Sequence, residues 1–433
     1  MNKKIQSLFY LSALIIMFIA CSKTAMNQAP AVDTELVNTA HLDYLYTPLT
    51  FPAGSKSAGV YIYADAPDYH RVEASGEGFS CVDDVSRAAL VYLRSTRFST
   101  DTAIQAKAMN LIRFILGMQS DNGYFYNFLF SSGLINTGGS TSLNIPNWWS
   151  WRALQTLIEG EPFIKNLNPP LFAQMDAAII KLIAQIKLDL VNIPQTTKIV
   201  NGITVPEWLP AGSATDQSAL LIIGLIPWCQ STNDAVLRDY IKKLADGIAL
   251  MQAGDSSHYP YGCFLSWENT WHAYGNIQAY ALLKAGLFLN DPQYTSKALV
   301  EIDNFYPWLI KNGYKSSLLL AKSGNVFQTL TDNKYDQIAY GIEPMVFAAI
   351  EAYKETGNDT YADLAGHLAA WLLGANDLGI SMYDTATGRC YDGLSAGGVN
   401  YNSGAESTIE ALLTLQNAEN YPAVITALDK YKK

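Results

Sequence analysis

The sequence predicts an all-α domain made of six helical hairpins. Helical periodicity begins near residue 82 and continues to the C-terminus, dividing the chain into twelve segments with apolar stripes. The links between segments alternate between very short and long, which pairs the segments into hairpins. The first helices of the hairpins are expected to start at 83, 148, 216, 268, 336 and 406, a spacing well above the ~34 residues of tetratricopeptide and ankyrin repeats.

Most of these helix starts are marked by a capping or turn residue ahead of an apolar stripe. The first stripe is Val85, Ala88, Ala89 and Tyr92, and the second helix is expected from about residue 101 to 119. The remaining helices are expected to start near residues 146, 169, 216, 233, 268, 291, 336, 358, 403 and 420. The segment 41–80 is expected to be irregular, with one strand-like run at 59–63.

The link lengths also predict which helices line the centre. Short links within hairpins require the second helix to return antiparallel, so all the long loops share one rim. Irregular loops as long as 121–145 or 375–402 are usually functional. The first helices are rich in Ala, Gly and Leu, as at 219–224, and are expected inside. The second helices carry more charge, as at 238–243, and are expected outside.

Composition and charge exclude several classes of protein. Of the 433 residues, 49% are hydrophobic and 16% charged, so the chain can bury one large core. The net charge of −10, with no Lys/Arg cluster outside the extreme termini, argues against a nucleic-acid partner. No metal-ligand spacing is present, and no metal or cofactor is expected. The remaining cysteines are widely spaced and are expected to be buried free thiols: Cys81, Cys229, Cys263 and Cys390.

The N-terminus has the pattern of an export signal. Lys3 and Lys4 precede an apolar run, Leu8 to Ala20, that is too short to span a membrane comfortably. The run meets Cys21 and resembles the lipobox of bacterial lipoproteins, whose cysteine is acylated. The resemblance implies a signal peptide at 1–20, lipidation of Cys21 and a tether at 21–40. A single domain at 41–433 would then be anchored by lipid to the bacterial membrane, on the periplasmic side or the outer-membrane surface.

Six hairpins in a ring resemble the (α/α)6 toroid of the six-hairpin glycosidase superfamily. Motifs at both ends are similar to those of a toroid domain often attached to glycosyltransferases: Cys-Val-Asp-Asp at 81–84, Asn-Asp-Leu-Gly at 376–379 and Gly-Ala-Glu-Ser-Thr at 404–408. The match covers most of residues 60–420, departs at Val85-Ser86 and lacks a glycosyltransferase half. The resemblance implies a funnel, lined by inner-helix N-termini and long loops, that binds sugar.

Acidic residues recur at the expected starts of the inner helices. One such residue alone is more often a helix cap, because carboxylates accept from the first amides and complement the helix dipole. Five of the six starts nevertheless carry acid, and they adjoin long loops that contain aromatic residues. The acids are Asp83, Asp84, Asp216, Glu268, Asp336 and Glu406.

Ring closure would bring the first and last hairpins together, so Asp83 or Asp84 is expected to face Glu406. Glycosidases with this fold commonly take the base from an early inner helix and the acid from a later one. By that analogy, Asp83 or Asp84 is the expected base and Glu406 the expected acid. Glu268 is the alternative acid, because flanking indoles would desolvate its carboxyl group.

Aromatic side chains beside carboxylates are typical of carbohydrate sites, since rings cover the C–H faces of a sugar while carboxylates accept from its hydroxyls. Tryptophans concentrate in the rim loops and in the first turns of the inner helices. The expected substrate-binding residues are Tyr126, Trp148, Trp149, Asp216, Trp267, Trp271, His272, Asp336 and Asp377.

These observations predict a carbohydrate-active lipoprotein that hydrolyses oligosaccharides through paired carboxylates. Two other readings stay open. A non-catalytic lipoprotein could hold an oligosaccharide or polysaccharide on the same aromatic rim. An epimerase or lyase would instead abstract a proton with His272. A lyase also needs a cation to neutralise the carboxylate of a uronate substrate. Arg87 and Arg152 are the only arginines near these helix starts.

Overall fold

Two concentric sets of helices form the frame of the computed structural model, which describes residues 36–51 and 54–433. The first helices of the hairpins are α2 (Val82–Leu93), α4 (Trp148–Ile164), α6 (Thr215–Thr232), α8 (Gln278–Leu289), α11 (Glu343–Thr356) and α13 (Ala405–Glu419). The second helices are α3 (Thr102–Gly117), α5 (Pro169–Asp189), α7 (Ala235–Leu250), α9 (Pro292–Val300), α12 (Asp359–Ala369) and α14 (Pro422–Tyr431). A π-helical turn, η2 (Glu301–Phe305), continues α9 into α10 (Tyr306–Asn312).

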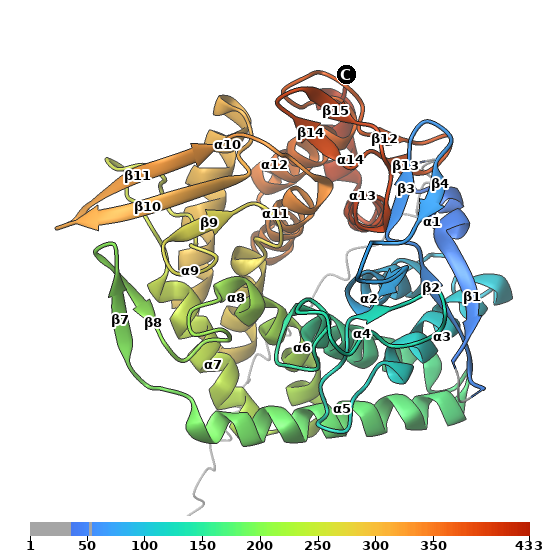
Figure 1. The fold of residues 1–433 in the computed structure, drawn as a ribbon. Coiled ribbons are helices and arrows are strands. Elements are labelled where there is room, and N and C mark those ends of the chain that lie inside the picture. Colours follow the sequence, from blue (N-terminus) through green and yellow to red (C-terminus); the bar gives the residue numbers. More distant parts are fainter. Residues whose placement is uncertain (1–35, 52–53) are drawn as a thin grey trace, which may run out of the picture. The chain divides into compact units, whose positions relative to one another are not determined.

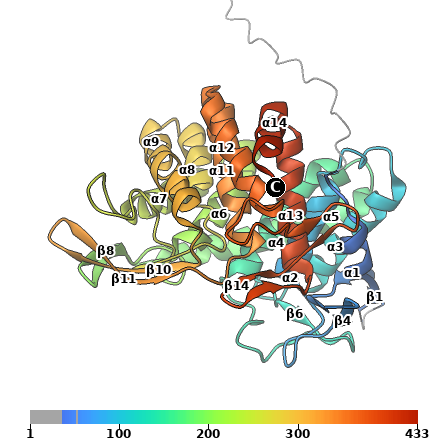
Figure 2. The same ribbon diagram turned by 90° about the horizontal axis from the view of Figure 1, so that it is seen from above.

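The first helices form a closed inner ring. Each packs against the next, in the order α2, α4, α6, α8, α11 and α13, and α13 packs back against α2 (Figure 1). Each second helix packs against its own partner on the outside of this ring (Figure 1). Figure 2 shows most of the strands at one end of the helices. The predicted six-hairpin (α/α)6 architecture, with the first helices inside and the second helices outside, is confirmed.

Burial follows the two rings. Helix α6 is apolar on nearly all sides and buries twelve of its side chains, because helices flank it on both sides and cover its outer face. Helix α7 carries charges such as Arg238 and Lys243 on one side and buries only the other. Free buried thiols were expected, and Cys81, Cys229, Cys263 and Cys390 are all unpaired and buried.

The helix starts are set by local capping. Asp101, Asn168 and Asp234 each accept a backbone N–H from the first turn of the outer helix that follows. Helix α2 is capped differently, because the Cys81 Sγ accepts the N–H of Asp84 at 3.4 Å. A thiol is a weak acceptor, but it takes the capping position here. The two acids in the first turn of α2 are therefore not used as caps and can bind other partners.

Two of the predicted helix starts are wrong. Helix α8 begins at Gln278 rather than Glu268, and α11 begins at Glu343 rather than Asp336. Glu268 lies in a tight turn with φ +48°, after which β9 (Thr270–His272) pairs with β10 (Ser317–Ser323). Asp336 follows β11 (Val326–Asn333) in an extended segment. The acidic residues mark the loops rather than the helices. Strand β9 lies between Glu268 and α8, and a β-bridge at Gln337 and a 3-10 turn, η3 (Ala339–Gly341), lie between Asp336 and α11.

The segment 41–80 is more regular than predicted. It forms α1 (Ala40–Leu45) and two antiparallel pairs, β1 (Tyr46–Thr50) with β2 (Lys56–Val60) and β3 (Tyr63–Asp65) with β4 (His70–Val72). The prediction of an irregular segment is wrong because β2 packs on α2 and α3, which buries four of its five residues. The expected strand-like run at 59–63 is divided between β2 and β3.

The long loops also contain short strands. Antiparallel pairs form between β5 (Ser80–Cys81) and β6 (Phe128–Leu129), β7 (Thr197–Val200) and β8 (Ile203–Pro206), β12 (Tyr383–Asp384) and β13 (Arg389–Cys390), and β14 (Gly393–Ser395) and β15 (Gly398–Asn400). The tips of the β7–β8 and β10–β11 hairpins meet, where Lys322 N–H donates to the Asn201 carbonyl at 2.8 Å (Figure 1).

The predicted export signal, the lipidated Cys21 and most of the tether lie outside the described residues. The last part of the predicted tether, residues 36–40, already contacts the domain, where the Asn38 N–H donates to the Tyr383 hydroxyl at 3.0 Å. Among the described residues, no helix has the length and apolarity needed to cross a membrane.

Candidate active site

The loops that precede the inner helices are joined to one another at one end of the ring. Thr215 N–H at the start of α6 donates to the Ser266 carbonyl, and Gly275 N–H before α8 donates to the Tyr340 carbonyl before α11. Gln337 pairs with Leu394, and Ala405 N–H at the start of α13 donates to the Ile62 carbonyl. These contacts place the N-termini of the inner helices on one rim.

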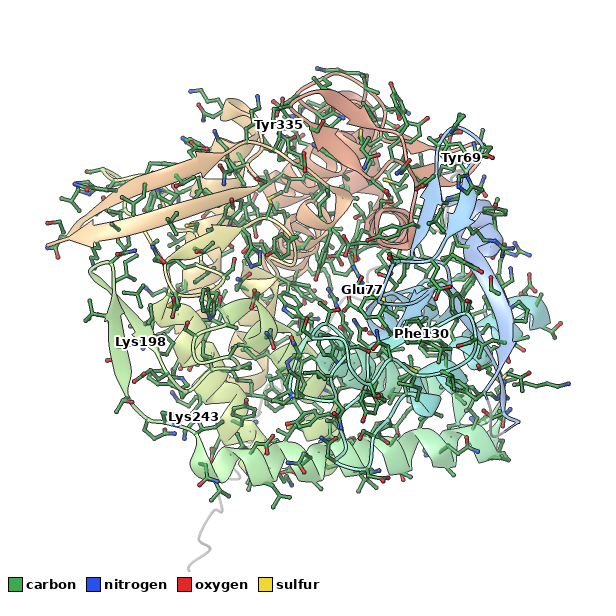
Figure 3. The ribbon with its side chains drawn as sticks, in the orientation of Figure 1. Tyr69, Glu77, Phe130, Lys198, Lys243 and Tyr335 are labelled. Atoms are coloured by element: carbon green, nitrogen blue, oxygen red, sulfur yellow. The ribbon has the colours of Figure 1, made fainter. Side chains whose placement is uncertain are left out.

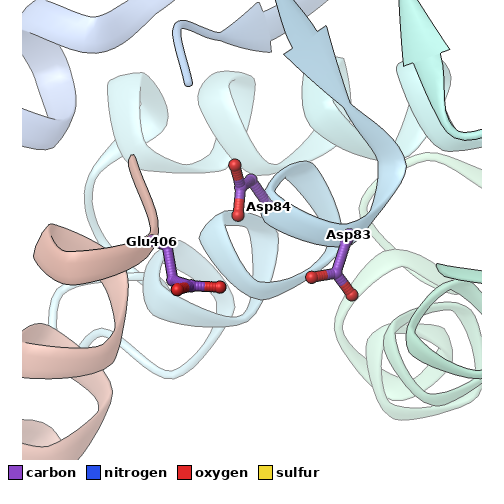
Figure 4. Close-up of side chains that lie close together, drawn as sticks. All are labelled: Asp83, Asp84 and Glu406. Carbon is purple, nitrogen blue, oxygen red and sulfur yellow. The ribbon is translucent and has the colours of Figure 1, made fainter. Parts of the chain in front are cut away.

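Three predicted catalytic carboxylates converge on this rim. Asp83 and Asp84 come from the first turn of α2, and Glu406 comes from the first turn of α13 (Figure 4). One carboxylate oxygen from each lies within 4.8 Å of the others. The closure of α13 against α2 therefore brings together side chains that are more than 300 positions apart in the sequence.

The Arg87 guanidinium lies among these carboxylates and is 1% exposed. Its Nη2 donates to Asp83 at 2.6 Å and to Asp84 at 2.8 Å, and it lies 3.3 Å from Glu406. Its Nη1 donates to Glu410, one turn after Glu406 on α13. Because this cation already occupies the space between the three carboxylates, a metal ion would have to displace it.

A second arginine and a tyrosine form the layer beneath. Arg152 of α4 donates from Nη2 to the Tyr340 hydroxyl at 2.6 Å, and its Nε lies 3.7 Å from Asp83. The Tyr340 ring packs against both guanidinium groups, at 4.8 Å from Arg87 and 5.4 Å from Arg152. Asp83 therefore has two cationic neighbours, while Asp84 has one.

The environment raises the proton affinity of two of the acids, Glu406 and Asp84. Desolvation raises the pKa of Glu406 to about 7, against the opposing pull of Arg87, and nearby Asp84 and Glu410 add to the rise. Desolvation likewise raises the pKa of Asp84 to about 6. A carboxyl group with a pKa near 7 holds a proton and can release it at neutral pH, as a general acid must.

A pocket of about 350 Å³ opens over the carboxylates. Besides Asp83, Asp84 and Glu406, its wall includes further acids and two tyrosines that the predictions did not name. These residues are Tyr63, Glu77, Tyr340 and Asp392. Glu77, labelled in Figure 3, comes from the segment between β4 and β5.

A helical spacing of four residues, from Asp83 to Arg87 and from Glu406 to Glu410, is the signal that could have identified the ion-pair network.

No protein-family model matches the chain, and neither does any curated protein. Solved structures match it along most of its length. The cellobiose 2-epimerase from Spirochaeta thermophila aligns with a TM-score of 0.56 at 13% identity, over 88% of this chain and 92% of that one. A sugar epimerase from a ruminal bacterium gives 0.55 at 11% identity, over 85% and 92%. The cellobiose 2-epimerase from Bacillus thermoamylovorans gives 0.54 at 11% identity, over 83% and 92%.

The chain shares the (α/α)6 toroid fold of these structures. At these identities the likeness establishes the fold alone. The reaction has to be inferred from the residues on the rim of this toroid.

Several predicted site residues lie elsewhere in the toroid. Glu268 pairs with Lys198 of the β7–β8 hairpin at 2.6 Å, away from the carboxylate pocket (Figure 3). Trp149 and Trp271 are buried, at 6% and 1% exposure, and pack in the core. Trp267 stays 45% exposed. Glu268 therefore lacks the desolvating indoles that would make it an acid, because Trp271 points into the core.

Other predicted binding residues hold loops in place. Asp377 accepts from Gln337 at 2.6 Å and lies 3.3 Å from Lys334. Asp336 is exposed and, like Asp377, does not line the carboxylate pocket. Tyr126 is partly buried against the core. Trp148 does lie near the pocket wall, because its ring and the Tyr340 hydroxyl both lie against Gly275, where a Cβ would collide with them.

Asp216 and His272 form a separate buried pair on the same rim. His272 Nε2 lies 3.1 Å from the Asp216 carboxylate, and its Nδ1 contacts the Tyr274 carbonyl at 2.8 Å. The Tyr274 ring stacks on the imidazole with centroids 3.7 Å apart and is itself 47% exposed. Both imidazole nitrogens of His272 are thus occupied within the fold.

The Glu406→Gln variant is expected to melt at a higher temperature than the wild type at pH 8, with a smaller difference at pH 5. The pKa of Glu406 is about 7 in the folded toroid, against ~4.3 in an unfolded chain. The folded state therefore binds the proton more tightly, and stability falls as pH rises through this window. Glutamine cannot ionise, so the variant does not lose this stability as the pH rises.

Scanning fluorimetry at both pH values measures this effect. Asp121→Asn, at a fully exposed carboxylate, is the control and should shift neither melting temperature. An equal change for Glu406→Gln at pH 5 and pH 8 would contradict the raised pKa.

Proposed function

We propose that the protein hydrolyses glycosidic bonds in oligosaccharides, with Glu406 as the general acid. The observation that supports this most directly is the convergence of Glu406 with Asp83 and Asp84 in one rim pocket. Glu406 has a pKa of about 7 and can protonate the leaving oxygen. Tyr63 is 44% exposed at the pocket wall and offers an aromatic face to a sugar ring.

The spacing of the carboxylates favours retention of configuration. Inverting enzymes separate their two carboxyl groups by roughly 6.5–9.5 Å to admit a water molecule, whereas retaining enzymes separate them by ~5–5.5 Å. The nearest carboxylate oxygens of Asp83 and Glu406 lie within 4.8 Å of each other, too close to admit a water molecule and a sugar ring between them. The expected base is therefore better described as a nucleophile.

Asp83 suits the nucleophile role better than Asp84. It is more accessible, with 22% of its side chain exposed against 6% for Asp84, and two guanidinium groups lie beside it. Its Oδ1 is buried next to Arg152 Nε, so the accessible oxygen is Oδ2, which accepts from Arg87 at 2.6 Å. Asp83 would attack the anomeric carbon as Glu406 protonates the departing oxygen. The resulting glycosyl ester would then be hydrolysed by water, which returns its proton to Glu406.

Epimerisation is the second candidate, favoured by the epimerases that share the fold and by His272 on the rim. A base that abstracts a carbon-bound proton needs a free nitrogen that reaches the substrate. Both nitrogens of His272 are engaged, and Tyr274 covers the ring. The other histidines lie outside the carboxylate pocket, so the geometry supports hydrolysis over proton abstraction.

A panel of oligosaccharides, incubated with purified protein and followed by chromatography and proton NMR, tests the proposal. Hydrolysis releases new reducing ends, and the first-formed product should keep the anomeric configuration of the substrate. An epimerase would change the sugar without shortening it, and a lyase would leave an unsaturated end. A protein that binds members of the panel and changes none of them would be the non-catalytic lipoprotein.

We further propose that Cys21 carries a lipid that anchors the toroid to the membrane. Cys21→Ser is expected to move the protein from the membrane fraction to the soluble fraction, because a tether makes few contacts with the folded domain. Cell fractionation and immunoblotting measure this shift, with Cys229→Ser as the matched control. If Cys21→Ser protein stayed with the membrane, the lipobox assignment would be wrong.

A further inference from the structure

The centre of the inner ring contains a second cavity, of about 340 Å³, on the other side of the arginine layer. Arg87 and Arg152 close its floor, and its walls come from α2, α4, α6, α8, α11 and α13. Its mouth lies at the C-terminal ends of α6 and α8, where Pro227, Gln230 and Leu287 are exposed. The cavity therefore opens at the end of the toroid opposite the rim pocket.

Most of the side chains in its wall are apolar, or carry a charge that is paired with an opposite charge. Ile223, Phe288 and Phe347 are among several hydrocarbon side chains that line it. The Arg94 guanidinium is paired with both carboxylate oxygens of Glu159, at 2.6 and 2.9 Å. At the mouth, Lys284 is paired with Glu351 at 2.9 Å. The charges that face the cavity thus already have partners within the fold.

Three hydrogen-bonding groups of this wall have no partner among the described residues. The Glu343 side chain is buried at 5% exposure, and it makes neither a hydrogen bond nor an ion pair. The Oε1 of Gln155 is buried and unpaired. The Tyr280 hydroxyl forms no hydrogen bond, although its ring packs edge-on against Phe347 at 5.7 Å. Gln155 Oε1 is fully buried, the Glu343 side chain is nearly so, and Tyr280 is half-buried, and all three residues line the cavity. Buried polar groups without partners are rare and costly, so Gln155 and Glu343 indicate a bound molecule to which Tyr280 can also bond.

The three groups also restrict the chemistry of that molecule. Gln155 lies on α4, Tyr280 on α8 and Glu343 on α11, so a ligand would need hydrogen-bonding atoms directed toward three walls. Desolvation and nearby Glu410 raise the pKa of Glu343, which favours the neutral form of its carboxyl group. Ligand sites of this size typically have mostly apolar walls and a few polar groups that orient the ligand.

We propose that this inner-ring cavity binds a neutral polyhydroxylated molecule of monosaccharide size. The hydroxyls of such a molecule donate to Gln155 Oε1 and exchange hydrogen bonds with Tyr280 and Glu343. Its C–H faces pack against Phe288 and Phe347. The site is independent of the rim pocket, from which the Arg87–Arg152 layer separates it.

Titration calorimetry with glucose, galactose, xylose, inositol and sorbitol tests this proposal, using the full-length protein at pH 7. At least one probe is expected to bind. Tyr280→Phe, which removes only the hydroxyl, should weaken that binding about 5- to 10-fold. Gln155→Leu, of similar volume, should do the same and serves as a second variant. Asp392→Asn, in the rim pocket, is the matched control and should leave this affinity unchanged.

Two results would overturn the proposal. One is binding that Asp392→Asn abolishes and that neither Tyr280→Phe nor Gln155→Leu affects, since the sugar would then occupy the rim pocket. The other is the lack of any binding heat at probe concentrations on the order of 10 mM. In that case water alone fills the cavity, on the order of ten molecules at ~30 Å³ each.

Discussion

Glu406→Gln is expected to lower the turnover of a cleavable oligosaccharide by about 10²–10⁴, while its affinity for that sugar changes little. Glutamine keeps the shape of the side chain and most of its hydrogen bonds, but it has no proton to transfer to the leaving oxygen. Steady-state rates and titration of the unreacted sugar separate the two effects. Because the same variant is expected to be more stable at pH 8, unfolding would not explain the loss.

The neighbouring carboxylates provide the controls for this experiment. Asp83→Asn should lose as much activity as Glu406→Gln, and Asp84→Asn should lose less, because Asp84 is less accessible. Glu268→Gln should keep nearly full activity, since its carboxylate pairs with Lys198 outside the pocket. Full activity in Glu406→Gln together with a loss in Glu268→Gln would move the acid to the loop before α8.

Arg87→Met is expected to destabilise the toroid by about 3–5 kcal/mol near pH 8. The substitution leaves the buried carboxylates of Asp84 and Glu410 and the partly exposed ones of Asp83 and Glu406 without the guanidinium that contacts all four. Arg87 holds down the raised pKa values of Asp84 and Glu406, so without it those two values would rise further. The destabilisation should therefore be largest above those values and should diminish as pH falls and the carboxylates bind protons. Denaturant unfolding at pH 8 and pH 5 measures both quantities.

Arg97→Met is the control for this variant. Arg97 pairs with Asp101 on the surface, with 72% of its side chain exposed, and its loss should change stability by about 0.5 kcal/mol or less at either pH. If Arg87→Met were no more harmful than Arg97→Met, or were equally harmful at both pH values, the four carboxylates would not depend on this cation.

Local patterns in the sequence predicted the six hairpins correctly, and also which helix of each hairpin faces inward. The apolar stripe that starts at Val85 and the short links fix which helices pair, and each pair can bury its faces only against its neighbours. The resemblance to (α/α)6 toroids implies that the hairpins close into a ring. In a closed ring the last hairpin lies between the fifth and the first, which placed Asp83 and Asp84 beside Glu406. The motif at 81–84 and the motif at 404–408 thus face each other across the seam.

The errors share a physical origin. Glu268 and Asp336 precede helices, but pairing between loops delays both helices: β9 pairs with β10 before α8 begins at Gln278, and Gln337 bridges to Leu394 before α11 begins at Glu343. Helical periodicity cannot reveal such pairing, because its partners lie far away in the sequence. Trp271 was expected on the rim for the same reason, yet β9 turns its indole into the core against Phe305. The cavity behind Arg87 and Arg152 depends on six helices at once, which no local pattern encodes.

The contact between Arg87 and Glu406 spans 319 positions of the chain, and it has a consequence for the order of events during biosynthesis. The carboxylate cluster is divided between the first and the last hairpin, so no growing chain contains it until nearly the whole sequence has left the ribosome. Closing so long a loop is also a late event in folding, because the chain loses conformational entropy before the contact stabilises it. The protein therefore has no assembled pocket while it is being made, and loss of its last hairpin would leave a partial ring without its acid.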